Sequence, residues 1–439
     1  MNNPNQNLIN IKDSSLFGKK LLVLAGADVH VKIVKAAKAL GVYTIVTDYL
    51  PLDLSPAKQV ADEYWMYSIT DTEAIVKKCI EEKVDGVLAY CIDPAQIPYQ
   101  KVCEALNLPC YGTHDQFDLL TDKRKFKDFC MAHGVGVIPE YPMEDVIEDR
   151  VVYPILVKPT ISRGSRGQTV CNGKTEVPPA LETARKESKD GGVLIERYMA
   201  GMQDMAFAYM VVDGEPYLLK IGDRYLGSPK DNLDRQQMAT VLPSCHTSEY
   251  IATSDCRVKE MIRQMGIRFG AVFFQGFYES GKEYMYDPGL RFPGSDFDLV
   301  LKHVTGFDPM TSFVQFALTG DERCCVGDIH GVYDYDGKGH CLIFSISARE
   351  GRITVLDGVE EVARHPFVFS ACKRYRVGDY IENKGDVTQR VAEFCAYIPC
   401  GESIEAFVDY IYHTVVVLDE RGEDMVVSRI SIKDSDYVL

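Results

Sequence analysis

The stretch Pro-Ile-Leu-Val-Lys-Pro-Thr-Ile-Ser-Arg-Gly-Ser-Arg-Gly, residues 154–167, decides the fold. A short apolar run carries Lys158 near its end, and a basic loop of small residues follows. Glycine lets a backbone turn and approach a ligand closely, and consecutive backbone N–H groups can form a concave anion site. Arginine and lysine add charge-assisted hydrogen bonds to phosphate oxygens. The stretch therefore predicts a strand and a loop that closes over a polyphosphate; the alternative is a solvated basic hairpin turn.

The loop matches neither of the two common phosphate-binding patterns. No Gly-Lys-Ser/Thr follows a four-residue spacer, which excludes a Walker A loop. Only Gly164 and Gly167 lie close together, too few for a dinucleotide fingerprint. The remainder of the chain has to identify the anion.

Composition indicates a globular protein of about three domains. The chain has 439 residues, 46% hydrophobic and 26% charged, with a formal net charge of −16. An acidic chain is not typical of a general nucleic-acid binder. Against that background, the basic pair Arg163 and Arg166 indicates a local site for an anionic ligand.

Cysteine usage and the N-terminus favour a cytoplasmic protein. None of the 14 cysteines forms a Cys-x-x-Cys pair, and several lie among apolar neighbours, as do Cys79, Cys103 and Cys395. The first residues are polar and lack the apolar centre of a signal peptide. No run approaches the ~20 apolar residues of a membrane span. We expect no membrane contact, and a homodimer as the commonest symmetric assembly.

The first third of the chain alternates strands with helices, which predicts a parallel sheet in an α/β domain. Expected strands are 20–26, 42–47 and 84–90, and expected helices are 29–40, 72–82 and 94–106. Asp48 ends the second strand and could mimic a ribose-binding carboxylate. Because Gly26-Ala27-Asp28 supplies no phosphate-binding glycine pattern, a structural role is favoured for Asp48.

Two further units follow. The second opens with Thr121 as the expected N-cap of a helix that stops near Gly134; further on come a helix over 177–190, a strand over 193–195, and antiparallel segments at 205–219 and 271–287. The last unit, from about residue 321, has short strands separated by turn dipeptides such as Asp336-Gly337. Its clearest helix is capped by Ser403 and carries on one face Ile404, Phe407, Val408 and Ile411.

Four features occur in a fixed order: Lys123 at a helix start, Lys158 with its basic loop, Val-Leu-Ile-Glu-Arg-Tyr-Met-Ala-Gly at 193–201, and Tyr-Met-Tyr-Asp-Pro-Gly-Leu-Arg-Phe-Pro-Gly at 284–294. This order resembles the ATP-grasp superfamily over roughly residues 20–430, in the group of carbamoyl-phosphate synthase, biotin carboxylase, phosphoribosylglycinamide synthetase and amino-acid ligases. The resemblance implies an α/β fold of three domains: a parallel-sheet pre-ATP-grasp domain (1–117), a central α+β ATP-grasp domain (118–320, with a mobile lid at about 135–200) and a small β-rich domain (321–439).

The resemblance also implies a nucleotide site. Lys123 and Lys158 would hold the phosphates, the loop would close over them, and the hinge at 196–199 would meet adenine. Gln203 or Asp204 would contact the ribose, where the family usually has a glutamate. The implied nucleotide-binding residues are Lys123, Lys158, Arg163, Gly164, Ser165, Arg166, Gly167, Glu196, Arg197, Tyr198, Met199, Gln203 and Asp204. For Glu196 alone, a solvated strand-end carboxylate is the alternative.

Catalysis and metal binding are implied for the 275–291 region. Arg291 would be the catalytic residue that binds an oxyanion, and Asp287 with Gln275 would hold Mg²⁺. The family usually has a glutamate where Gln275 stands and an asparagine where Gly289 stands. Nearby, Glu279 and Glu283 are interpreted as residues of a hairpin turn around Gly281.

The implied activity is that of an ATP-dependent carboxylate–amine ligase, which forms an acyl phosphate and releases ADP and phosphate. Its substrates would be a small carboxylate and an amine, and its cofactors ATP and Mg²⁺. One alternative is a nucleotide-binding protein with lost or altered catalysis, and another is an ATP-dependent carboxylase. A nicotinamide enzyme is disfavoured by the missing glycine fingerprint. A polar stretch could face the substrate or be a solvated loop: Tyr225, Arg235, Gln236 and Gln237.

Overall fold

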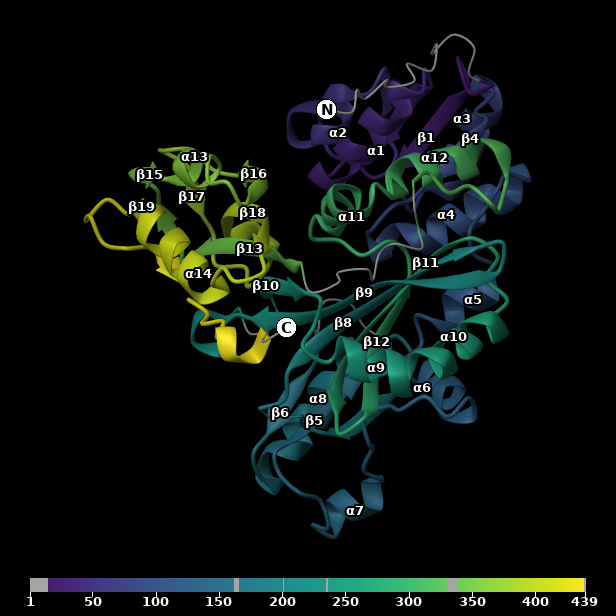
Figure 1. The fold of residues 1–439 in the computed structure, drawn as a ribbon. Helices are drawn as coiled ribbons and strands as arrows, with labels where there is room; N and C mark the ends of the chain where they lie inside the picture. Colours follow the sequence, from purple (N-terminus) through teal and green to yellow (C-terminus); the bar gives the residue numbers. More distant parts are fainter. Residues whose placement is uncertain are drawn as a thin grey trace.

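The computed structural model describes residues 15–161, 166–199, 201–233, 236–327, 329 and 338–437. Figure 1 shows an N-terminal lobe, a central body that ends in a protruding lower lobe, and a C-terminal lobe to one side. Within the described ranges, every helix is too short or too polar to cross a bilayer.

The N-terminal lobe contains the predicted parallel sheet. Its strands lie in the order β3-β2-β1-β4, all parallel, with bounds Lys20–Leu24 (β1), Tyr43–Thr47 (β2), Glu63–Trp65 (β3) and Gly86–Leu88 (β4). Its helices are Asp28–Ala39 (α1), Pro56–Val60 (α2), Thr72–Glu82 (α3) and Asp93–Leu106 (α4). A later helix, Pro309–Thr319 (α12), returns to pack on α1 and β4. The α/β prediction for this part of the chain is confirmed.

The central body is built on a nine-stranded antiparallel sheet of order β12-β11-β8-β9-β10-β13-β18-β16, with β20 paired to β13. The segments predicted as antiparallel form two hairpins, β8–β9 and β11–β12. Strand bounds are Asp204–Val212 (β8), Glu215–Leu226 (β9), Gln237–Leu242 (β10), Gly270–Glu279 (β11), Lys282–Leu290 (β12), Gly339–Ala348 (β13), Val368–Lys373 (β16), Arg390–Pro399 (β18) and Val426–Val427 (β20). Strands of the C-terminal lobe therefore extend the central sheet.

Helices cover one face of the central sheet. They are His114–Leu119 (α5), Lys123–Ala132 (α6), Thr247–Thr253 (α9) and Asp255–Gln264 (α10), and Phe297–Thr305 (α11) follows β12. Phe126 of α6 stacks on Phe274 of β11 at a ring distance of 5.7 Å. The N-cap of α6 is Asp122, whose carboxylate accepts hydrogen bonds from two backbone N–H groups. The prediction of Thr121 was wrong by one residue, because a carboxylate one position later reaches the free N–H groups of the first turn.

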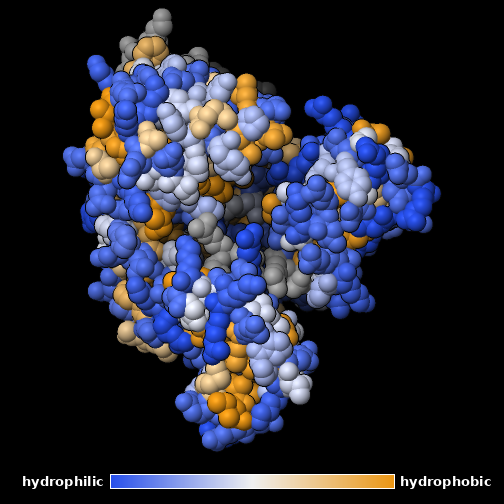
Figure 2. All heavy atoms as spheres, turned by 180° about the vertical axis from the view of Figure 1, so that it is seen from behind, coloured by the Kyte–Doolittle hydropathy of each residue, from blue (hydrophilic) through white to orange (hydrophobic). Residues whose placement is uncertain are grey.

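The lower lobe has a sheet and a hydrophobic cluster of its own. The sheet order is β6-β5-β7, with bounds Ile155–Pro159 (β5), Thr169–Cys171 (β6) and Val193–Arg197 (β7). Helix Val177–Glu187 (α8) packs on β5, and Met143–Ile147 (α7) lies at the tip. Figure 2 shows apolar side chains on this lobe, where three large ones are exposed: Ile147, Val152 and Val170. The lobe's separate core makes it a compact unit.

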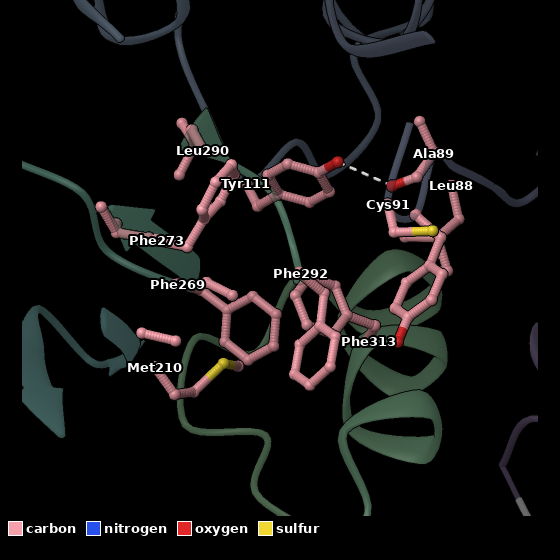
Figure 3. Packing of buried hydrophobic residues seen from close by; sticks show 14 of the residues in the cluster. Leu88, Ala89, Cys91, Tyr111, Met210, Phe269, Phe273, Leu290, Phe292 and Phe313 are labelled. Carbon is pink, nitrogen blue, oxygen red and sulfur yellow. Dashed lines mark hydrogen bonds between the residues drawn. The ribbon is translucent and has the colours of Figure 1, made fainter. Parts of the chain in front are cut away.

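One continuous core joins the N-terminal sheet to the central sheet. Figure 3 shows Tyr111 of this core, whose hydroxyl donates to the Ala89 carbonyl at 2.6 Å. The Tyr111 ring meets Phe313 of α12 edge-on at 5.6 Å. Because protein cores are close-packed, this cluster fixes the two sheets relative to each other.

The C-terminal lobe packs around a second cluster. Its smaller elements are Gly351–Arg352 (β14), Val355–Asp357 (β15), Val359–Val362 (α13), Tyr380–Ile381 (β17), Ile404–Thr414 (α14) and Val416–Leu418 (β19). The hydroxyl of Ser403 accepts from the Ala406 N–H at 2.9 Å, and the four predicted apolar residues of α14 are buried. Both features confirm the predicted helix. The buried thiols of Cys79, Cys103 and Cys395 are also confirmed.

Candidate functional site

A buried cluster of charges joins β5, β7 and α6. Lys158 on β5 and Glu196 on β7 are diagonal neighbours in the lower-lobe sheet, and the Lys158 Nζ lies 2.6 Å from the Glu196 Oε2. Lys127 of α6 approaches the other oxygen, Oε1, also at 2.6 Å. Glu196 has an exposed fraction of 0%. Its alternative as a solvated carboxylate is therefore wrong.

The cluster stays ionised because its charges are paired. Burial by itself favours the neutral form of Glu196, but the charges of Lys158 and Lys127 outweigh burial and lower the pKa of this carboxyl. Burial is also the largest influence on Lys158, and it lowers the pKa of that ammonium. Lys127 was missed by the sequence reasoning. Its position four residues after Lys123, on the same face of one helix, is the signal that could have found it.

Lys123 connects this cluster to the central sheet. Its backbone N–H donates to the Thr160 carbonyl at 3.4 Å, at the end of β5. Its Nζ lies 3.7 Å from the Asp287 Oδ1 on β12. Asp287 faces Gln275 across the β11–β12 ladder, and its side chain is 40% exposed. The predicted phosphate lysine and metal carboxylate are thus neighbours.

A second buried network occupies the same sheet face. The Arg224 Nη1 lies 2.5 Å from the Asp204 Oδ1, and the Tyr286 hydroxyl lies 2.6 Å from the Asp204 Oδ2 and 3.2 Å from the Gln275 Oε1. Burial raises the pKa of Asp204, and Arg224 opposes this. Both Asp204 oxygens therefore have protein partners. The Gln203 amide donates to the carbonyls of Asp204 and Arg224 at 3.0 and 2.7 Å.

Arg291 is held in one orientation. Its Nε lies 2.5 Å and its Nη2 3.2 Å from the two carboxylate oxygens of Asp93, at the start of α4. The guanidinium carbon is 4.3 Å from the centroid of the Phe273 ring. This ring also explains Gly289: a Cβ there would meet the Phe273 Cε1 at 2.1 Å. A bulky ring on β11 thus excludes any side chain at residue 289.

The structure describes the whole hinge at 196–199 but only part of the basic loop. Arg163, Gly164 and Ser165 lie outside the described residues. Arg166 is exposed, and Gly167 has a φ of +72°, a conformation that glycine adopts without strain. In the hinge, Arg197 and Tyr198 are exposed, and Met199 is buried.

The polar stretch that was suggested to face the substrate lies next to the C-terminal lobe. Tyr225 lies on the opposite sheet face and its hydroxyl is 2.8 Å from that of Tyr437. The Gln236 amide donates to the Gly385 carbonyl, and the Gln237 carbonyl accepts from Arg390. These three residues contact the C-terminal lobe, and the suggestion that they face a substrate stays a prediction; Arg235 lies outside the described residues.

Two carboxylates have structural roles. Asp48 is 2.8 Å from the buried ammonium of Lys58, which confirms the structural interpretation. Glu283 was expected in a turn, but it is fully buried on β12 and contacts Arg257 at 3.1 Å. The turn lies two residues earlier, at Gly281. Glu279 is exposed, as expected of a turn residue.

The metal prediction can be tested against the donors present. Among the described residues, no group of three or more His, Cys, Asp or Glu side chains is arranged to hold a metal. Asp287 and Gln275 supply one carboxylate and one amide oxygen. Mg²⁺ usually binds through one or two carboxylates plus water and phosphate oxygens. These donors therefore fit a Mg²⁺ that arrives with a phosphate ligand.

The sequence has recognisable relatives. Residues 122–251 match the family model described as "Carbamoyl-phosphate synthase L chain, ATP binding domain". The carbamoyl phosphate synthase large chain of Clostridium botulinum (strain Langeland) is 28% identical over 202 residues, 44% of this chain and 18% of that protein. The 2-oxoglutarate carboxylase small subunit of Hydrogenobacter thermophilus is 24% identical over 249 residues, 52% of this chain and 51% of that protein. The chain thus spans about a fifth to a half of these relatives' lengths.

The fold has close structural counterparts. Phosphoribosylglycinamide synthetase from Anaerococcus prevotii gives a TM-score of 0.71 at 15% identity, over 92% of this chain and 100% of that one. An L-amino acid ligase from Bacillus licheniformis gives 0.71 at 18% identity, over 92% and 99%. Both matches cover nearly the whole chain, so all three lobes share this fold.

Proposed function

We propose that the chain is an ATP-dependent carboxylate–amine ligase of the ATP-grasp superfamily, because residues 122–251 match a carbamoyl-phosphate synthase ATP-binding domain and the whole fold resembles two ligases. The observation that carries the proposal is the meeting of Lys123, Lys158 and Asp287 between the lower lobe and the central sheet. The substrates would be a small carboxylic acid and an amine, as the matched ligase domains suggest.

We propose that ATP lies between the lower lobe and the central sheet. Lys123 and Lys158 bind its phosphates, residues 162–167 close over them, and the backbone of 196–199 meets adenine. The biotin carboxylase domain of Hydrogenobacter thermophilus 2-oxoglutarate carboxylase, which shares this fold at 18% identity, was solved in complex with MgADP, which supports nucleotide binding. Because Asp204 is bound by Arg224 and Tyr286, the ribose contact falls to Gln203.

The chemistry is transfer of the γ-phosphoryl group to the carboxylate of the first substrate. The carboxylate oxygen attacks phosphorus, ADP leaves, and an acyl phosphate forms. The amine then attacks the acyl carbon, loses a proton, and releases phosphate. Mg²⁺, held by Asp287 and Gln275 when bound, would neutralise charge on the transferred group. Arg291, oriented by Asp93 and Phe273, binds the phosphoryl oxygens as charge develops.

The proposal includes three domains, at 1–117, 118–320 and 321–439, with a lid at about 135–200 and a homodimer as the assembly. The separate core of the lower lobe supports a lid that moves as a unit. The biotin carboxylase domain of the 2-oxoglutarate carboxylase is a dimer, which supports the dimer proposed here. Light scattering of the purified protein tests the dimer directly.

The test separates binding from turnover. Calorimetry with ATP and MgCl₂ should give binding to the wild type and a loss of at least about tenfold in Lys158→Met. ADP release across a panel of acids and amines should then exceed the background rate. With hydroxylamine as the nucleophile, an activated acid appears as its hydroxamate. A folded protein that binds ATP but yields neither ADP nor hydroxamate with any acid would contradict the ligase proposal.

A further inference from the structure

A buried lysine on the central sheet has no carboxylate beside it among the described residues. Lys220, Gly222 and Arg224 alternate along β9 and share one sheet face. Arg224 is paired with Asp204. Lys220 is 3% exposed, and among the described residues its ammonium has the Phe297 ring as a neighbour, at 4.9 Å, but no carboxylate within ion-pair distance.

Burying a charged lysine without an anion costs free energy, and the shifted pKa of Lys220 reflects this cost. Burial is the main cause that lowers the pKa of Lys220 to about 7, and the charge of Arg224 acts in the same direction. Groups with strongly shifted pKa values cluster at functional sites, which makes this lysine a candidate for ligand binding.

A second polar group without a partner lies beside it. Thr240 on β10 is fully buried, and its hydroxyl has no hydrogen-bond partner among the described residues. The Thr240 Cγ2 and the Lys220 Cε lie 2.7 and 3.2 Å from the point where a Cβ on Gly222 would stand. The side chains of Lys220 and Thr240 therefore both lie over Gly222, and the sheet fixes the positions of their backbones.

The strand register relates this pair to the proposed phosphoryl-transfer site. Lys220 pairs with Ala208 on β8, and Ala208 pairs with Phe273 on β11. The Arg291 guanidinium lies over the Phe273 ring. Two strand spacings, roughly 10 Å, therefore separate the strands of Lys220 and Phe273. The small side chain of Ala208 lies between two cationic groups on one face. A substrate lying across this face of the sheet would meet Lys220 at one end and Arg291 at the other.

We propose that Lys220, with Thr240, binds a second anionic group of the acceptor acid, so that the substrate carries a carboxylate or phosphate besides the carboxylate that is activated near Arg291. This inference rests on the proposed ligase function. The lysine acts as a positioning residue for the reacting end of the substrate and takes no part in the bond changes.

The first experiment measures stability without ligand. Lys220→Met keeps the apolar stem and removes the unmatched charge, so the unfolding midpoint should rise by about 2 °C or more. The matched control is Lys58→Met, which removes an equally buried lysine that is paired with Asp48 and should lower the midpoint. A fall in the midpoint of Lys220→Met would assign the lysine a purely structural role and overturn the proposal.

The second experiment measures ligand binding in the presence of ATP and MgCl₂. Succinate and glutarate (dicarboxylates) and phosphoglycolate (a phosphorylated acid) are compared with acetate and butyrate by thermal shift and ADP release. A dianion should bind the wild type, lose about 100-fold affinity in Lys220→Met, and keep binding within about tenfold in Lys220→Arg. Whether succinate, glutarate or phosphoglycolate binds identifies the second anion as carboxylate or phosphate.

The outcomes distinguish this inference from the ligase proposal. Absence of ATP binding by the wild type contradicts the ligase proposal. Normal ATP binding with equal response to monoanions and dianions, or with no dianion bound, overturns only the role of Lys220. Thr240→Val should weaken the dianion about tenfold without a change in ATP affinity, and it provides the same test in a variant that keeps the lysine.

Discussion

Lys158 and Lys220 are both fully buried, yet they differ in one respect: Lys158 has Glu196 at 2.6 Å, and Lys220 has no carboxylate among the described residues. Burial lowers the pKa of both ammonium groups. The first lysine lies in the lower lobe, inside a network that protein groups complete. The second lies on the central sheet, in a network that a ligand would complete. A buried lysine thus has a protein countercharge at the proposed phosphate site and, among the described residues, none at the proposed acid site.

Removing the anion from the lower-lobe cluster should have the largest effect. Glu196→Gln leaves Lys158 and Lys127 buried without their shared countercharge, and we expect a loss of roughly 3 kcal/mol in unfolding free energy at pH 7, measured by urea denaturation. Because the folded-state pKa of Glu196 is lowered, its contribution is present above the unfolded value of about 4.3 and fades as pH falls through the lower folded value.

Glu140→Gln is the matched control for that change. Glu140 contacts Lys127 at 2.8 Å, but its side chain is 23% exposed, so its loss should cost about 1 kcal/mol or less. If Glu196→Gln is no less stable than Glu140→Gln, Glu196 does not stabilise the buried lysines. The difference drawn between Lys158 and Lys220 would then be contradicted.

The central-sheet lysine should also make the free energy of unfolding rise with pH, but in a higher pH range than Glu196. A folded-state pKa of about 7, below the usual 10.5, means that the folded protein loses its proton first. Unfolding free energy of the wild type should therefore rise by about 2 kcal/mol relative to Lys220→Met between pH 7 and pH 9. Paired urea titrations at the two pH values measure this difference. A constant difference would show that Lys220 titrates normally.

A carboxylate placed beside Lys220 should give it a protein countercharge, as Glu196 does for Lys158. Ala208 is directly opposite Lys220, so Ala208→Asp places a carboxylate within reach across the strands. The pKa of Lys220 should rise by about one unit, worth ~1.4 kcal/mol, which can be followed by NMR of selectively labelled lysine. Dianion binding should be lost, because the new carboxylate takes the ligand's place. Ala208→Asn is the neutral control of the same size, and retained dianion binding in Ala208→Asp would contradict this.

The aromatic neighbour of Lys220 should have the smallest effect. Phe297→Leu removes the ring that lies 4.9 Å from the ammonium. A double-mutant cycle with Lys220→Met should give a coupling of about 0.5–1 kcal/mol, after the packing loss common to both backgrounds cancels. A coupling near zero would show that Phe297 only covers the lysine.

The sequence was informative where local signals determine structure. Alternation of strands and helices predicted the parallel sheet, and the Ser403 cap predicted α14. It was less informative where a side chain's partner comes from far along the chain. Lys127 was missed, and the contact of Tyr225 with Tyr437 was not foreseen, since these contacts depend on segments 69 and 212 residues away.

By itself, the sequence determined the order of the elements and the likeness of its spaced motifs to the ATP-grasp superfamily, because hydrophobic periodicity and motif order are local properties. Only the tertiary structure decided which charges meet. The sheet register placed Asp287 beside Gln275, Phe273 against Gly289, and Lys220 opposite Ala208. Whether a buried charge is matched or left for a ligand depends on these long-range pairings, and no local pattern encodes them.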